Sequence, residues 1–504
     1  MSPELLKTIA DTNQWWAIGP ELILGCAALG LLVLEIIAPK DQHRFIPFVA
    51  MLALVAVLGA VVANFTNPPE SDALFGGLIK LSPYGQIARV FFLLSSLLVC
   101  FIATICLPRT RMPRVEFYHI VLVVTAALML LAQSDHFVMF FVALETVTIG
   151  FYILVSYFRD NALTLEAGLK YLVLGALSSA IMLFGIVLIY GAVGRVVVQG
   201  VVHTGFEFGV IQNFLKENPD NFLAVAGALL VVGGVAFKIG AFPFQIWIPD
   251  VYQGAPTPVT AFLAVSSKAA GFAVLLTLTH TAFAPLAYVL SPALSFLAAA
   301  TIIVGNLSAL SQRNAKRLMG LSGVSHAGYL LIGVVASLSV PAAVTGVWFY
   351  LFTYLLASMT VFGVMAYMAG EDDTLQELDH YDKLAKERPV LGAVLAVGIG
   401  SLAGIPPLAG FMGKLLIFVT AFQAHLYPLL IVAIGGVVVS IYYYFGWIKA
   451  AYFEAWSPNP GAPRGARPLP AAPSRLGSTV LAVLAIATVV LGFYQEPLIS
   501  WLAP

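Results

Sequence analysis

Four ionisable side chains stand inside apolar stretches of the sequence, where charge is expensive. Glu145 lies in FFVALETVTIGFYILV and Lys238 in GVAFKIGAF, while Lys268 and Lys414 lie in AVSSKAAGFAV and FMGKLLIFV. On insertion scales, a charge at the centre of a membrane helix costs about 2.5–3.5 kcal/mol. Ionisable residues at such depth usually mark ion pathways or proton relays. The pattern therefore predicts proton transfer among these four residues.

Glu145 and Lys238 are the natural partners in this group. Burial opposes the charged form of each side chain, while mutual attraction favours it. A pair balanced between these two effects can exchange a proton. The alternative for Glu145 is a purely structural role, in which its carboxyl group stays neutral and only packs against its neighbours. Lys268 follows Ser266 and Ser267 and lies too deep for its ammonium to reach the membrane surface, which favours a functional role.

Prolines interrupt two of the same apolar stretches. Pro243 follows Lys238, and Pro406 and Pro407 precede Lys414. Proline removes a backbone donor and breaks helical pairing, which membrane proteins tolerate only inside protein or beside water. A kink for packing is the alternative. Broken helices at corresponding positions are typical of transporters built from internal repeats.

Two further residues have evenly matched interpretations. Lys170 can form a helical ion pair with Glu166, four residues before it, or take part in proton transfer. His326, in GLSGVSHAGYLL, can be a hydrogen-bonded core residue or a relay. The remaining charges near the ends of apolar stretches are predicted to snorkel towards the membrane surface; they are Glu21, Glu35 and Arg89.

Composition and hydropathy settle the fold class. Of 504 residues, 60% are hydrophobic and 10% charged, against about 25% charged in soluble proteins. A helical span needs about 20 apolar residues, and no barrel-like alternation occurs, so we predict an all-α polytopic membrane protein. Fourteen spans are expected, at 17–38, 45–65, 84–107, 115–133, 136–157, 165–192, 222–242, 256–279, 287–309, 317–337, 341–369, 390–421, 426–448 and 476–495.

Cations between the spans predict the orientation. If the N-terminus is outside, the inner loops hold 16 Lys and Arg residues and the outer side holds 4. The positive-inside rule then places both termini outside. The N-terminal region lacks a small-residue cleavage site, so a secretory signal peptide is not expected.

The segments between spans leave little room for a soluble domain. Residues 193–221 read as a polar outer segment, 371–389 as an amphipathic interfacial helix, and 458–473 as a flexible inner linker. Nucleotide-binding glycine motifs are absent, and Cys26, Cys100 and Cys106 lack metal-ligand spacing. Acidic and basic residues balance at 25 each, which argues against nucleic acid as a partner. We therefore expect no cofactor and no metal in this chain.

The stretch PFQIWIPDVYQGAPTPV (243–259) resembles the signature of subunit N of proton-pumping NADH:quinone oxidoreductase, the respiratory complex I. Three other stretches agree: LET around Glu145, QRNAKRLMGLSGVSHAGY (312–329) and LAGIPPLAGFMGK (402–414). The PDVYQGAP sequence is more similar to subunit N than to the sister subunits L and M. The resemblance covers nearly the whole chain.

This resemblance implies roles for the residues already singled out. Glu145 would tune Lys238 of broken helix 7, protons would pass through Lys268 of helix 8, and Lys414 of broken helix 12 would face the exit. His326 would lie in the central hydrophilic axis, and Lys170 at the head of helix 6. The family's usual histidine is replaced here by Gln245, which cannot titrate.

The resemblance also implies an organisation. Helices 1–3 would occupy residues 1–112, two inverted five-helix repeats 113–280 and 281–455, and the inner linker with helix 14 residues 456–504. The subunit would sit in the bacterial inner membrane beside an M-type subunit and small membrane subunits. NADH, FMN, iron–sulfur clusters and quinone would belong to partner subunits, with no redox centre in this chain.

Three other functions remain compatible with the sequence. A subunit of a multisubunit cation/proton antiporter or membrane-bound hydrogenase would use the same lysines and glutamate without NADH. A structural membrane scaffold would have lost the pumping role. A secondary transporter for an organic substrate is less favoured, because no polar cluster suggests such a ligand.

Overall fold

The computed structural model describes residues 12–63, 74–108, 115–198, 201–374, 376–453 and 474–503. Twelve helices within these residues are long and apolar enough to cross a membrane, and shorter apolar helices accompany them. The protein is therefore an all-helical polytopic membrane protein, with one short hairpin among the residues that the structure describes. The proline-rich linker predicted at 458–473, and the loop cations Lys7, Arg109, Arg111, Arg114, Arg464 and Arg467, lie outside the described residues.

The first half of the chain contains eight numbered helices and a hairpin. These are α2 (Gly19–Ile37), α3 (Ile46–Ala63), α4 (Pro83–Cys106), α5 (Val115–Leu131), α6 (Phe137–Val155), α7 (Ala162–Val193), β1 (Arg195–Val198), β2 (Val201–Thr204), α8 (Phe208–Glu217) and α9 (Phe222–Ile239). The 3-10 turns η1 (Trp15–Ile18) and η2 (Lys40–Phe45) precede α2 and α3.

The second half begins after the break that follows α9 and contains the second interrupted span. Its elements are η3 (Phe244–Trp247), α10 (Ile248–Gly254), α11 (Thr257–Phe262), the π-helical turn η4 (Leu263–Ser267), α12 (Lys268–His280), η5 (Ala284–Leu286), α13 (Ala287–Ala309), α14 (Ala315–Ser337), α15 (Ala342–Met368), η6 (Leu378–Tyr381), α16 (Leu384–Glu387), α17 (Pro389–Ala403), α18 (Ala409–Gln423), α19 (Tyr427–Tyr452), α20 (Arg475–Phe493) and α21 (Glu496–Leu502).

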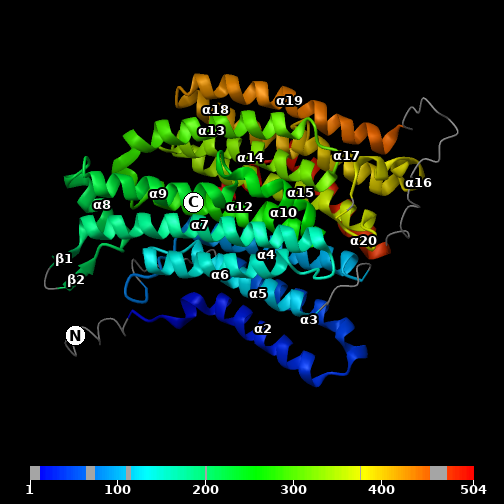
Figure 1. Ribbon diagram of the computed structural model, residues 1–504, viewed down its shortest axis with the longest axis horizontal. Coiled ribbons are helices and arrows are strands. Elements are labelled where there is room, and N and C mark those ends of the chain that lie inside the picture. The colour runs from blue at the N-terminus through cyan, green and yellow to red at the C-terminus, as the bar shows by residue number, and fades with distance from the viewer. Residues whose placement is uncertain are drawn as a thin grey trace.

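The helices lie roughly side by side, with α2 at one edge of the bundle and α19 at the other (Figure 1). The β1–β2 hairpin and α8 stand at one end, which we call the hairpin face, and α16 stands at the opposite end, the α16 face. The spans Thr257–His280 and Ala315–Ser337 are buried throughout their most hydrophobic windows, and α15 nearly so. These three spans form the centre of the bundle, so their polar residues lie farthest from lipid.

Both predicted breaks end a helix with the same backbone motif. At the end of α9, Gly240 has φ +73°, and Ala241 N donates to Ala236 O at 2.9 Å. At the end of α17, Gly404 has φ +84°, and Ile405 N donates to Gly400 O at 3.0 Å. Each is the 6→1 bond of a Schellman motif, which needs the left-handed glycine. Both predicted interruptions are therefore real helix ends.

The structure adds detail to one expected connecting segment and corrects another. The polar segment 193–221 contains the antiparallel β1–β2 hairpin and α8. The expected amphipathic helix at 371–389 is reduced to the short turns η6 and α16. Asp373 explains the second difference: its buried carboxylate accepts hydrogen bonds from Thr257 N at 2.5 Å and Gln376 Nε2 at 2.6 Å, which hold the segment in an irregular path.

The prediction that Glu21 and Arg89 snorkel is wrong. Arg89 Nη2 lies 2.7 Å from Glu21 Oε1 in an ion pair whose side chains are 4% and 3% exposed. The same nitrogen donates to Ala17 O at 2.7 Å. A guanidinium that satisfies both a carboxylate and a carbonyl can stay buried. The pair therefore fastens α2 to α4 within the membrane region.

Replacing Arg89 with alanine is expected to destabilise the chain by about 3–5 kcal/mol, because the Glu21 carboxylate keeps its buried position without a partner. Thermal unfolding of the purified complex measures the change. The double variant Glu21→Leu/Arg89→Met is the control, since it removes both charges and should recover most of the loss. A midpoint for Arg89→Ala equal to that of the unmodified complex would contradict this assignment.

Candidate functional site: a buried lysine and histidine axis

Glu145 and Lys238 lie near each other but each has a hydroxyl partner. Ser179 Oγ of α7 donates to Glu145 Oε1 at 2.5 Å, and Lys238 Nζ donates to Thr148 Oγ1 at 2.5 Å. Thr148 is three residues after Glu145 on α6, so one helix turn separates the two partners. Among the described residues, no direct ion pair joins Glu145 to Lys238. Instead of the expected pair, the structure has two neighbouring hydrogen bonds, one from Ser179 to Glu145 and one from Lys238 to Thr148.

A small cavity connects Lys238 with the central helices. It measures about 10 Å³ and is lined by Thr148, Lys238 and Ser267, among others. That is about the volume that one water molecule requires. Ser267 directly precedes Lys268 in the chain. The cavity therefore has room for one water molecule beside Lys238, on the side that faces η4 and α12.

Lys268 occupies the first position of α12, directly after the π-helical turn η4. Its Nζ donates to Gly323 O at 2.6 Å and to Tyr354 Oη at 3.2 Å, and it also lies 4.7 Å from the Tyr354 ring centroid. A π-helical turn inside a helix frequently accompanies a functional residue. Lys268 thus joins α12 to both other central helices, α14 and α15.

His326 stands at the middle of a tyrosine cluster. Its Nδ1 lies 2.7 Å from Tyr350 Oη and its Nε2 lies 3.1 Å from Tyr444 Oη. The Tyr354 ring, which also contacts Lys268, lies 5.0 Å from the imidazole. Both ring nitrogens therefore have hydroxyl partners. The imidazole is placed to receive a proton at one nitrogen and release it at the other.

Lys414 lies at the second break and closes the series. Its Nζ donates to Leu402 O at 3.0 Å and Ala403 O at 2.9 Å, which are carbonyls at the C-terminal end of α17. It also lies 5.2 Å from the ring of Tyr329, which packs against His326. A helix C-terminus favours a cation through its free carbonyls and dipole.

The two lysines at the breaks are not placed equivalently. Lys238 lies in the last turn of α9, before its break, whereas Lys414 lies on α18, after the break, and reaches back to α17. The sequence suggested the same combination of proline and lysine in both spans. The structure shows that Lys414 Nζ binds the carbonyls at its break, whereas Lys238 Nζ binds Thr148 of the neighbouring helix α6.

Lys170 lies apart from this axis, at the α16 face. It forms the expected ion pair with Glu166, at 2.6 Å, and a second one with Asp250, at 2.5 Å. Arg317 of α14 contacts the other oxygen of Asp250 at 2.7 Å. Asp250, from the PDVY motif, therefore bridges α7 and α14. This carboxylate was not singled out in the sequence, although its motif pointed to the right segment.

The neutral partners are what sequence reasoning missed. The hydroxyls of Thr148, Ser179, Tyr354 and Tyr444 complete the hydrogen bonds of the charged residues. Tyrosines in apolar spans give no signal, because they are common in membrane helices. Gln245, at the family's histidine position, lies in η3 with its buried Oε1 free of any partner among the described residues.

No group of three or more His, Cys, Asp or Glu side chains in the described part of the chain could hold a metal ion. The candidate site consists of proton-exchanging groups: one carboxylate, three lysines and one histidine.

Buried lysines beside two broken helices, in a bundle of this form, define an antiporter-like membrane protein. A family model described as NADH:quinone oxidoreductase/Mrp antiporter, TM, matches residues 134–440. The chain is 59% identical over 507 residues to NADH-quinone oxidoreductase subunit N 1 of Opitutus terrae, covering 100% of this chain and 99% of that protein. The chain therefore belongs to the subunit N members of this family.

Solved structures agree with this assignment. A chain of respiratory complex I from Thermus thermophilus with bound Aureothin is similar with a TM-score of 0.78 and 30% identity, covering 95% of this chain and 98% of that one. A chain of the Mrp complex from a Dietzia species has a TM-score of 0.79 at 20% identity, covering 96% of each. The second likeness concerns the fold alone.

Proposed function

We propose that this chain is the proton-translocating subunit N of an NADH:quinone oxidoreductase. Protons move through it along Glu145, Lys238, Lys268, His326 and Lys414. The observation that carries the proposal is the series of buried polar contacts that runs between the two broken helices. Within it, Lys268 contacts Tyr354 and Lys414 contacts Tyr329, and both tyrosine rings pack against His326.

The chemistry is proton transfer driven by changes in charge and conformation elsewhere in the complex. Moving one elementary charge against 100 mV takes about 2.3 kcal/mol. A change of partner at one lysine supplies energy of this order, because hydrogen bonds to charged groups contribute about 1.5–3 kcal/mol each. Each lysine has one such partner to exchange: Thr148 for Lys238, the Gly323 carbonyl for Lys268, and the carbonyls at the end of α17 for Lys414.

We further propose fourteen spans arranged as three N-terminal helices, two inverted five-helix repeats (113–280 and 281–455) and a final helix after the linker (456–504). The short helix α5 and the α17–α18 pair supply the spans beyond the twelve long ones. The repeat is supported by the shared Schellman ends and by a glycine three residues before a proline in both breaks, Gly240 to Pro243 and Gly404 to Pro407.

The proposed location is the bacterial inner membrane, with both termini and the hairpin face on the outer side. The cation distribution supports this orientation, since most loop Lys and Arg residues of the described part of the chain fall at the α16 end. One of them, Lys316, is not a solvated loop cation. It is fully buried and pairs with Asp373 at 3.3 Å.

A neighbouring membrane subunit is expected to cover Glu145. This carboxylate is half-buried, and Val142 and Ile149, on the same face of α6, are 56% and 55% exposed. A carboxylate at this depth requires a polar or cationic environment. We propose that small membrane subunits supply this polar or cationic environment. An M-type subunit would bind a different surface of this chain. NADH, FMN, iron–sulfur clusters and quinone would then act in other subunits.

Proton pumping by the variants Glu145→Ala and Lys238→Ala tests this function. We expect both to lose most proton pumping and coupled quinone reduction while the complex still assembles. Pumping is measured as acidification of inverted membrane vesicles during NADH oxidation. Lys216→Ala is the matched control, because this lysine is exposed on α8 and far from the axis. Normal proton stoichiometry in both test variants would exclude the proposed path.

A further inference from the structure

A cavity of about 580 Å³ opens at the hairpin face, outside the axis described above. It lies between the start of α4, the α5–α6 connection, the end of α12 and the α14–α15 connection. The α5–α6 connection is tied to the hairpin segment, because Phe208 N donates to Asp135 O at 3.1 Å and Phe137 N to Phe206 O at 2.8 Å. The cavity therefore belongs to the proposed outer end of the protein.

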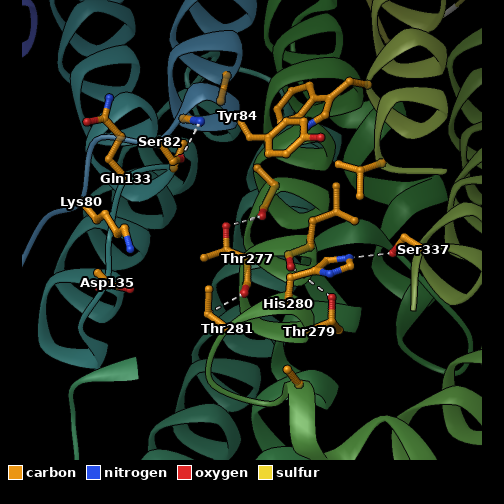
Figure 2. A pocket seen from close by; sticks show the side chains of 18 of the residues that line it. Lys80, Ser82, Tyr84, Gln133, Asp135, Thr277, Thr279, His280, Thr281 and Ser337 are labelled. Carbon is orange, nitrogen blue, oxygen red and sulfur yellow. Dashed lines mark hydrogen bonds between the residues drawn. The ribbon is translucent and has the colours of Figure 1, made fainter. Parts of the chain in front are cut away.

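The rim of this cavity is polar and its floor is apolar. Figure 2 shows Lys80 and Asp135 on one side, facing His280 and Thr281 on the other. Desolvation outweighs the lowering effect of nearby Lys80, and the pKa of Asp135 is raised to about 6. The wall of α12 continues inward to Ala273, eight residues and about 12 Å from Thr281. The cavity thus enters the membrane region.

Its wall carries unused hydrogen-bonding capacity. Thr277 Oγ1 donates to Ala273 O at 3.0 Å, which leaves its oxygen lone pairs free to accept. Ser337 Oγ donates to Val334 O at 2.7 Å, so His280 Nε2 must be the donor in its 2.9 Å contact with that oxygen. The Trp348 indole N–H is buried and has no acceptor among the described residues. Buried polar groups on the wall of a roomy cavity are normally satisfied by water.

An aromatic cluster separates the cavity from the protein centre. Phe91 of α4 packs edge-on against Trp348 and Phe352 of α15, with ring centroids 6.2 Å and 5.1 Å apart. Farther inward on α4, Ser95 Oγ lies 2.7 Å from Ser266 Oγ, which is two residues before Lys268. Ser95 is seven residues, or two turns, from Ala88 in the cavity wall. Polar groups therefore resume directly beyond the aromatic cluster.

We propose that this cavity is an aqueous vestibule through which Lys268 exchanges protons with the outer phase, gated by Phe91, Trp348 and Phe352. Apolar constrictions open and close by wetting and dewetting. In the closed form described here, the gate keeps the axis from leaking; movement of α15 would open it toward Ser95 and Ser266. The inference rests on the proposed proton path, and it adds an outer branch at Lys268 to the exit expected at Lys414.

Thiol labelling of Thr277→Cys tests whether the vestibule is open to water. A membrane-impermeant, anionic methanethiosulfonate is added to right-side-out vesicles that contain the assembled complex, and pumping is then measured in inverted vesicles prepared from the labelled membranes. We expect labelling of Thr277→Cys and loss of proton pumping, with NADH oxidation by an artificial acceptor unchanged. Thr360→Cys is the matched control, because this buried threonine also donates to its i−4 carbonyl but lies outside the cavity. Absence of labelling at Thr277→Cys would overturn the proposal.

The gate is tested by Phe91→Ala, which should cause loss of the proton gradient in resting vesicles. Phe362→Ala is the control, since Phe362 is equally buried on α15 but not in the aromatic cluster. Assembly of each variant is checked by copurification of the complex. A tight gradient in assembled Phe91→Ala vesicles would refute the gate. If the vestibule tests fail while Lys268→Met stops pumping, the proton path stands without this branch.

Discussion

Proton pumping is expected to fall by about 10²-fold or more when Lys268 is replaced by methionine, the range seen when a positioned proton-transfer group is removed. Lys268 contacts both α14 and α15, through Gly323 O and Tyr354 Oη. The methionine side chain has a length similar to that of lysine but carries no exchangeable proton. The proton path is then cut between Lys238 and His326.

Two measurements separate this result from misfolding. NADH oxidation by an artificial acceptor reports the redox subunits and should remain normal, while acidification of vesicles should disappear. Lys268→Arg keeps a cation but exchanges its proton with great difficulty, so it should assemble well and still pump poorly. Full pumping by Lys268→Met would contradict the central position of this lysine.

The charged members of the site were predictable because each one violates membrane hydropathy. Glu145, Lys238, Lys268 and Lys414 stand out against apolar neighbours, and the prolines beside two of them signal broken helices. The span pattern follows from the same contrast, since 20 apolar residues suffice to cross a bilayer. These features are local, and local patterns can be read along one chain.

The contacts that complete the site were not predictable, because they join residues far apart in the sequence. His326 meets Tyr444 across 118 positions, and Arg89 meets Glu21 across 68. Arg89 was expected to snorkel only because its partner was unknown. The irregular course of 371–374 likewise depends on Thr257, which precedes its partner Asp373 by 116 positions. Whether a polar residue is buried or exposed in these places depends on a partner that is distant in the sequence, and hydropathy does not identify that partner.

Gly323→Ala is expected to reduce pumping nearly as strongly as loss of the lysine itself. A Cβ at position 323 would stand 2.8 Å from Lys268 Nζ and 3.2 Å from Tyr354 Oη. The ammonium must then move away from this position, which disturbs its hydrogen bonds to the Gly323 carbonyl and to Tyr354. One added methyl group thus displaces the middle lysine without changing any titratable residue.

Vesicle acidification measures the effect of Gly323→Ala, and Gly435→Ala provides the matched control. A Cβ at Gly435 of α19 meets nothing within 4 Å, so that variant should pump normally and gain about 0.5–1 kcal/mol of helix stability. Adding Lys268→Met to Gly323→Ala should cause no further loss, because both changes act on one contact. Independent, additive losses would show that Gly323 acts through packing of α14 and not through the ammonium of Lys268.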